Sequence, residues 1–91
     1  MSLQFEWNEN KAKQNLEKHG VSFAAASIFG DPLSITIDDP LHSVNEIRFI
    51  TLGESAANNL LVVVHTDRTG VIRIISAREA TRGEKQNYET G

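Results

Sequence analysis

The arginines are the residues of this chain whose types and spacing best suit chemistry. All five lie at or after position 48, and three of them, Arg73, Arg78 and Arg82, run from an apolar segment into a polar one. Arg73 interrupts a run of Val and Ile that is typical of a β-strand, so its charge must emerge on a sheet face or meet a partner. Forked guanidinium donors on rigid elements suit phosphate binding. Ordinary surface salt bridges would explain the same spacing.

Two further candidates lie on predicted strands. Because side chains alternate along a strand, residues 46–52 place Glu46 and Arg48 on one face. They form either an exposed ion pair or, together with Arg73, the lining of a concave sheet surface. His65 ends the most hydrophobic strand, residues 60–66. An imidazole would be firmly held there, although a histidine at a strand end is more often structural.

Composition argues against several kinds of site. The chain has no cysteine, and His19, His42 and His65 show no short metal-ligand spacing. Its glycines occur singly, so the sequence contains no glycine-rich loop that could cradle a phosphate. Neither a metal nor a cofactor is therefore expected. The remaining possibility is a metal-free site built from Arg, Glu and His side chains and Tyr88.

Length and charge indicate one domain with a local anion site. The 91 residues, 40% of them hydrophobic, suit a single globular domain over residues 1–91. Residues 1–45 hold three lysines against six carboxylates, whereas residues 46–91 hold six cations against six carboxylates. An anion site therefore belongs to the second half. The longest apolar run is too short to cross a membrane and no targeting segment is visible, so we expect a cytoplasmic protein.

The elements that must position these residues change type along the chain. Asn8 as a cap and Gly20 as a terminator predict a helix over about residues 9–19, and Ser22 begins a second helix that ends near residue 29. From residue 33 the apolar period becomes 2, which predicts strands over residues 33–38, 46–52, 60–66 and 71–76. Short connections between the later strands favour antiparallel pairing.

A last helix is predicted over residues 77–88, because Ser76 and Glu79 have the spacing of a capping box. It would carry Arg78 and Arg82 on one stripe, with Lys85 close by. Arg73 at the strand end and Arg78 in the first helical turn could then converge on one phosphate. The expected architecture is α+β: two N-terminal helices, an antiparallel sheet of about four strands and a C-terminal helix.

Several ordered stretches carry a resemblance to a known family. The chain resembles BrnT-type toxins of bacterial type II toxin–antitoxin pairs in Phe5–Asn8, Asn15–Phe23, Phe29–Leu33, Glu46–Gly53, Leu61–Thr66 and Arg73–Thr81. Asn8 stands where BrnT-type proteins usually have Asp, and both residues cap helices. The resemblance implies a RelE-like fold, RNA cleavage that inhibits translation, and neutralisation by a small BrnA-type antitoxin. DNA would be reached only indirectly, through that antitoxin.

Metal-free RNA cleavage needs a base for the 2′-hydroxyl, cations for the scissile phosphate and an acid for the 5′-oxygen. The candidate cations are Arg48, Arg73 and Arg78. Candidates for binding the flanking RNA are Arg82, Lys85 and Lys18. His65 or Glu46 is the candidate base, and the other of the two, or Tyr88, is the candidate acid.

Two other functions fit the sequence. A noncatalytic small protein-binding module could pair with a DNA-binding partner through an exposed strand edge and the weakly apolar last helix. A dimeric DNA-binding autoregulator is disfavoured, because the chain is acidic overall and shows no helix-turn-helix or basic ribbon.

Overall fold

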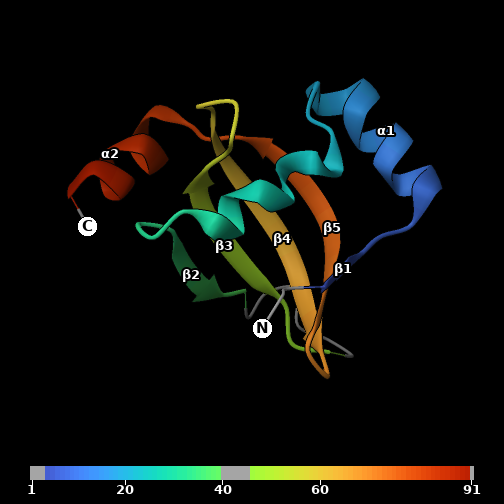
Figure 1. The fold of residues 1–91 in the computed structure, drawn as a ribbon. Coiled ribbons are helices and arrows are strands. Elements are labelled where there is room, and N and C mark those ends of the chain that lie inside the picture. The colour runs from blue at the N-terminus through green and yellow to red at the C-terminus, as the bar shows by residue number, and fades with distance from the viewer. Residues whose placement is uncertain (1–3, 40–45, 91) are drawn as a thin grey trace.

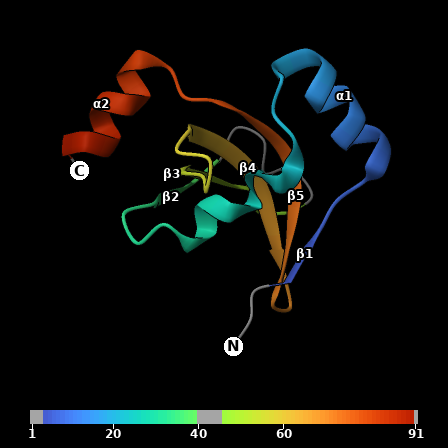
Figure 2. The same ribbon diagram turned by 45° about the horizontal axis from the view of Figure 1, so that its top comes forward.

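A five-stranded sheet forms the centre of the molecule. The computed structural model describes residues 4–39 and 46–90. Its strands are β1 (Gln4–Glu6), β2 (Ile35–Asp38), β3 (Phe49–Glu54), β4 (Leu60–Arg68) and β5 (Val71–Glu79), in the order β1-β5-β4-β3-β2. In Figure 1 and Figure 2, α1 (Glu9–His19) lies beside β5, the 3₁₀ helix η1 (Phe23–Gly30) crosses the sheet, and α2 (Arg82–Thr90) lies on the side away from α1.

The sheet is mixed, so the expected antiparallel sheet of about four strands is wrong. Strands β2 to β5 do form an antiparallel meander, but β1 adds a fifth strand parallel to β5, with Phe5 opposite Ile72. Parallel neighbours need a long crossover, and here the crossover includes most of the chain. The pairing of a three-residue strand with so distant a partner leaves no local signature in the sequence.

The expectation of two N-terminal α-helices is also wrong, because the described N-terminal residues contain one α-helix, α1. α1 covers the predicted residues: the Asn8 side chain accepts a hydrogen bond from Lys11 N, and Gly20 ends the helix with φ 70°. The following segment is a 3₁₀ helix, and Ser22 makes no side-chain capping bond. Phe23 and Ile28 of this segment are buried in the core. The longer rise of a 3₁₀ helix, ~2.0 Å per residue, lets so short a segment stretch across the sheet.

The last helix begins later than predicted, at Arg82. Ser76 lies within β5 opposite Val64 of β4, so the spacing of Ser76 and Glu79 does not start a helix. The same pattern recurs at Thr81 and Glu84, where Thr81 N donates to Glu84 Oε1 and Glu84 N donates to Thr81 Oγ1. Strand pairing and the burial of apolar β5 residues against η1 outweigh the earlier capping signal.

One face of the sheet carries the core, and a β-bulge decides which β5 residues reach it. The core contains Phe23, Ile28, Leu61, Val63, Ile74 and Ala77. Ile74 and Ala77 are three residues apart, which a regular strand would place on opposite faces. The register shifts between Val64 and His65, so β5 holds one extra residue there. As a consequence, Arg73, Ser76 and Arg78 all point to the face opposite η1.

Asn15 joins α1 to β5, and Gly53 allows η1 to pack closely on β3. The Asn15 amide donates to Ala77 O (2.7 Å) and to Val21 O (2.9 Å), and Asn15 Oδ1 accepts from Ala77 N (3.1 Å). This buried side chain takes the place of a strand beyond the point where β1 stops pairing with β5. On β3, a Cβ added to Gly53 would lie 3.1–3.2 Å from Ser34 and Ile28, so glycine permits the close approach of η1.

Candidate functional site

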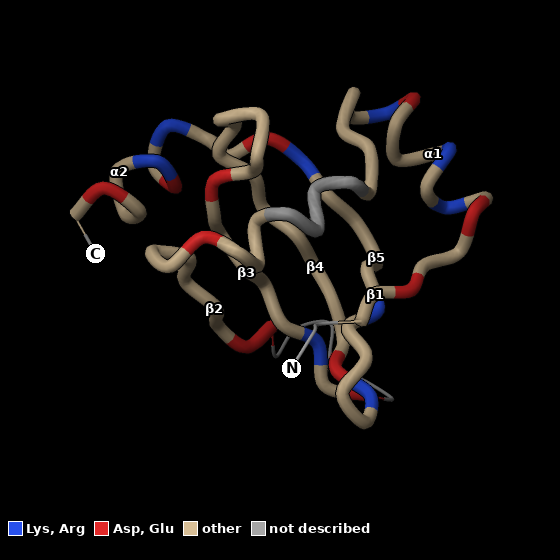
Figure 3. Tube along the Cα trace, viewed as in Figure 1, with Lys and Arg blue, Asp and Glu red and all other residues tan. Residues whose placement is uncertain are grey.

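An arginine–glutamate cluster lies where the β4–β5 hairpin turns. Thr69 and Gly70 have φ 49° and 85°, the positive values of a two-residue hairpin turn. This turn pairs Arg68 with Val71 and puts Arg68 on the same face as Arg73. Arg68 binds Glu46 through both fork positions, Nε–Oε2 at 2.9 Å and Nη2–Oε1 at 2.8 Å. Basic and acidic positions gather at this end of the molecule in Figure 3.

A second ion pair and a third arginine complete this cluster, which we call the hairpin-end cluster: Glu6, Glu46, Arg48, Arg68 and Arg73. Arg73 Nη1 lies 3.2 Å from Glu6 Oε1 of β1. The pKa of Glu46 is lowered, first by its hydrogen bonds from Arg68, and also by the charges of Arg48 and Arg73, against the opposing effect of desolvation. Glu46 is therefore ionised at neutral pH. The cluster thus brings three guanidinium groups and two carboxylates together.

The hairpin-end cluster has the groups needed to bind a phosphodiester. Its ion pairs are at the surface, where they contribute little to stability and exchange partners easily. A phosphate has the same forked geometry as the Glu46 carboxylate, so it can replace that carboxylate on Arg68. The displaced Glu46 would then be a free proton acceptor beside the bound anion. The cluster thus combines charge stabilisation with a candidate base.

Arg78 is not part of this cluster. It lies five residues beyond Arg73 on the same strand face, roughly 15 Å away by strand geometry, so the two side chains do not converge on one phosphate. The expectation of convergence placed Arg78 in a helix, whereas it lies in β5. Arg78 forks onto Glu84 of α2, with two contacts of 2.8 Å. Hydrogen bonds from Arg78, followed by one from Thr81 N, lower the pKa of Glu84 to about 2.

The side chain of His65, on β4, is buried. It is 3% exposed, lies edge-on to Phe29 at 4.9 Å and stacks on Phe49 at 5.8 Å. Its Nε2 is 2.7 Å from Thr51 Oγ1, which in turn is 2.8 Å from Thr36 Oγ1. Burial lowers the pKa of His65, and the carboxylate of Asp67 opposes part of that effect. A base in this position has no direct path to an RNA hydroxyl.

The other predicted residues lie apart from the hairpin-end cluster. Tyr88 donates a 2.6 Å hydrogen bond to Asp31 Oδ2, and this bond raises the pKa of Tyr88 to about 12. A phenol with this pKa is a poor proton donor at neutral pH. Arg82 and Lys85 are exposed on α2, and Lys18 is exposed in the last turn of α1. These assignments therefore stay predictions.

Sequence reasoning missed Arg68 and Glu6. Arg68 stands in the segment Asp67–Gly70, which the sequence identifies as a turn. A two-residue turn at Thr69 and Gly70 would have placed Arg68 on the face of Arg73, so a signal was present. Glu6 had none, because it reaches Arg73 only through the parallel pairing of β1 with β5.

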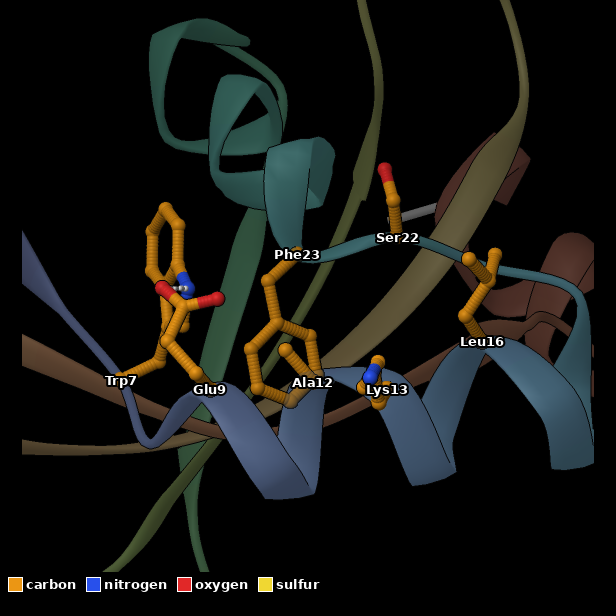
Figure 4. Close-up of a pocket in the computed structure, with 7 residues that line it drawn as sticks. All are labelled: Trp7, Glu9, Ala12, Lys13, Leu16, Ser22 and Phe23. Atoms are coloured by element: carbon orange, nitrogen blue, oxygen red, sulfur yellow. Dashed lines mark hydrogen bonds between the residues drawn. The ribbon is translucent and has the colours of Figure 1, made fainter.

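A separate apolar hollow lies between α1 and η1. It has a volume of about 270 Å³ and is lined by Trp7, Glu9, Ala12, Lys13, Leu16, Ser22 and Phe23 (Figure 4). Trp7 Nε1 donates to Glu9 Oε1 at 3.2 Å. Its mostly apolar walls do not suit a phosphate. Within residues 4–39 and 46–90, no three potential metal ligands gather, and no helix is long and apolar enough to cross a membrane.

Known proteins resemble this chain in sequence pattern and in fold. A family model described as the ribonuclease toxin BrnT of type II toxin–antitoxin systems matches residues 7–84. A comparison with curated proteins found no match. The 1.1 Å crystal structure of the Brucella abortus ribonuclease toxin BrnT superposes with a TM-score of 0.64 at 21% identity, covering 89% of this chain and 100% of that one. This likeness shows a shared fold. Because the family model spans most of the sequence, the chain belongs to the BrnT family of ribonuclease toxins of type II toxin–antitoxin systems.

Proposed function

We propose that this protein cleaves RNA in the cytoplasm without a metal ion, thereby inhibits translation, and is neutralised by a BrnA-type antitoxin. The observation that carries the proposal is the hairpin-end cluster, which combines three arginines with the ionised carboxylate of Glu46 on one exposed end of the sheet. Family membership supports the ribonuclease class.

The proposed reaction is an internal transesterification. The 2′-oxygen attacks the adjacent phosphorus, the P–O5′ bond breaks, and the product carries a 2′,3′-cyclic phosphate. Glu46 takes the 2′-hydroxyl proton, and the departing 5′-oxygen takes a proton from water. Arg68 and Arg73 stabilise the extra negative charge that develops on the phosphate oxygens, with Arg48 adding positive charge nearby.

In the proposed mechanism, substrate binding makes Glu46 a stronger base. With Arg68 bound to both carboxylate oxygens, Glu46 is a weak base, which its lowered pKa reflects. When a phosphate takes over the Arg68 fork, Glu46 loses those two hydrogen bonds and its pKa rises toward its ordinary value. The base therefore becomes effective only when an RNA phosphate is in place.

Cleavage of labelled RNA by purified protein in the presence of a chelator tests the proposal. We expect products with cyclic or 3′-phosphate ends, and a loss on the order of 10²-fold for Arg68→Ala or Arg73→Ala, as for one preorganised charge-stabilising donor. Glu46→Gln should lose cleavage activity by a similar factor. Arg68→Lys should keep only part of the cleavage activity, because lysine has the charge but lacks the fork. The control is Lys13→Ala on α1.

Two outcomes would contradict this mechanism. One is activity that appears only with added magnesium and disappears with chelator. The other is full activity in folded Arg68→Ala and Arg73→Ala. Expression in cells, with and without a gene for the proposed BrnA-type antitoxin, tests the biological part through growth, RNA integrity and incorporation of labelled amino acids. Toxicity that a BrnA-type antitoxin fails to relieve would refute the antitoxin assignment.

A noncatalytic binding module is the second candidate, and the edge of the sheet favours it. β2 is an edge strand of the sheet. Three large apolar residues near it are each more than half exposed: Leu33, Ile37 and Ile47. Such exposure is typical of surfaces that bind protein. A protein that cuts no RNA, on or off ribosomes, but binds a DNA-binding partner protein tightly would establish this function. In the proposed ribonuclease toxin, the same edge is available to the antitoxin.

A further inference from the structure

We infer that the groove between α1 and β5 is a second phosphate site, which holds RNA beside the point of cleavage. This inference rests on the proposed ribonuclease function and deepens it. The groove has a volume of about 270 Å³, and Lys11, Lys18 and His19 of α1 line it together with Ile75 and Ser76 of β5. It is distinct from the apolar hollow on the other side of α1 and from the hairpin-end cluster.

The helical repeat and one buried amide build this groove. Lys11, Gln14, Asn15 and Lys18 follow each other at helical spacing and so form one stripe of α1. Asn15 ties that stripe to β5 through its two hydrogen bonds with Ala77. These two hydrogen bonds are buried and hold the helix at a fixed position along the strand. The backbone positions of the lysines on either side of Asn15 are therefore fixed as well.

The charge of the groove is suited to an anion. Its lining contains two ammonium groups, an imidazole, two amides and a hydroxyl, but no carboxylate. Among residues 4–39 and 46–90, no carboxylate forms an ion pair with Lys11 or Lys18. In contrast, Arg68, Arg73 and Arg78 each bind a glutamate. A phosphate entering the groove therefore displaces only water and counterions, which favours binding.

The bulge in β5 aligns the groove with the hairpin-end cluster. Because of the extra residue, Ser76 lies on the same sheet face as Arg73. The two positions are three residues apart, roughly 10 Å along the strand. A stacked nucleic-acid strand advances about 3.4 Å per nucleotide. An RNA strand that has its scissile phosphate at Arg73 would thus reach the groove within about three nucleotides. This gives Lys18 a specific place in RNA binding.

Binding of a fluorescent, all-2′-O-methyl oligonucleotide tests the inference, because this probe has no 2′-hydroxyl to attack and binding is measured without cleavage. Lys11→Gln combined with Lys18→Gln should weaken binding on the order of tenfold at low salt. The slope of log affinity against log salt should fall by about 0.7 for each lost phosphate contact. Lys13→Gln is the control for each single Lys→Gln change, since it removes one positive charge from the same helix but lines the apolar hollow.

Cleavage kinetics separate this site from the reacting centre. For a long RNA the double variant should raise KM and leave kcat unchanged, and for a dinucleotide both should match the parent. Thermal unfolding should also match the parent, because both lysines are exposed. If the parent cuts no RNA, the proposed function fails while the binding measurement still reports on the groove.

Parent-like oligonucleotide affinity in the double variant, or a loss no greater than that of Lys13→Gln, would overturn the inference. So would unchanged RNA binding combined with weakened binding of the antitoxin, since the groove would then be a protein-binding surface. A lowered kcat for the dinucleotide would assign the lysines to the reacting centre instead.

Discussion

Glu84→Gln should destabilise this protein in a pH-dependent way while leaving RNA cleavage largely intact. Glu84 accepts both fork contacts of Arg78 at 2.8 Å and also caps α2 through Thr81 N. Glutamine can still accept the capping bond, so the change isolates the charge. The two residues join β5 to α2, and the ion pair therefore stabilises the attachment of the C-terminal helix.

The magnitude follows from the pKa of Glu84, which falls from 4.5 to about 2. A shift of this size, converted in full, would correspond to about 3 kcal/mol. The side chains of Arg78 and Glu84 are 41% and 30% exposed, so solvent screens part of the interaction and about 1–2 kcal/mol remains. For a domain of this length, such a loss lowers Tm by about 5–15 °C.

The sign of the pH dependence is set by a carboxyl whose folded-state pKa is depressed. Its contribution to the free energy of unfolding is complete above about pH 4.5 and is lost as the pH falls through about 2. Urea unfolding of the parent and of Glu84→Gln should therefore differ at pH 7 and converge near pH 2. Glu89→Gln, which removes a charge from the same helix, is the control and should match the parent at both values.

Two results would refute this reasoning. The first is a Glu84→Gln variant that is as stable as the parent at pH 7, or whose deficit persists unchanged in acid. The second concerns the role of Arg78: a folded Arg78→Ala protein that loses 10²-fold or more in RNA cleavage below its unfolding temperature would place Arg78 in the reacting centre. We expect Arg78→Ala to lose stability and to keep most of its cleavage rate.

Three further predictions concern stability, each measured as the free energy of unfolding in urea. Asn15→Ala should cost about 2–4 kcal/mol, because it leaves the buried N–H and C=O of Ala77 unpaired; a loss below about 0.5 kcal/mol would show that water replaces the amide. Gly53→Ala should cost about 1–3 kcal/mol through its contact with Ile28, whereas Gly83→Ala, which meets open space, should not destabilise. Because burial lowers the pKa of His65 below 6.5, its stabilising effect is complete above that pH and declines as the pH falls further; a His65→Gln variant with an unchanged pH profile would contradict this.

The features that the sequence determined by itself are those with short-range causes. Asn8 and Gly20 satisfy the end groups of one helix, so α1 could be placed over residues 9–19, and that prediction is confirmed. Period-2 patterning located the strands of the β2–β5 meander, although their ends shift by up to three residues. The ordered stretches that resemble BrnT-type toxins indicated the family, which the family model confirms. The first two signals are each contained in a short segment, and the third is a set of short stretches in a fixed order along the chain.

Only the tertiary structure decided how the charged side chains are grouped. Two capping patterns, at Ser76 and at Thr81, stand five residues apart. Because β5 pairs with β4 through Ser76, only Thr81 caps α2. The bulge near His65 depends on register between two strands, yet it determines the face to which Arg73 and Arg78 point. Glu46 meets Arg68, and Glu6 meets Arg73, across separations of 22 and 67 residues. Such contacts depend on the packing free energy of the whole sheet, which no local pattern of residues contains.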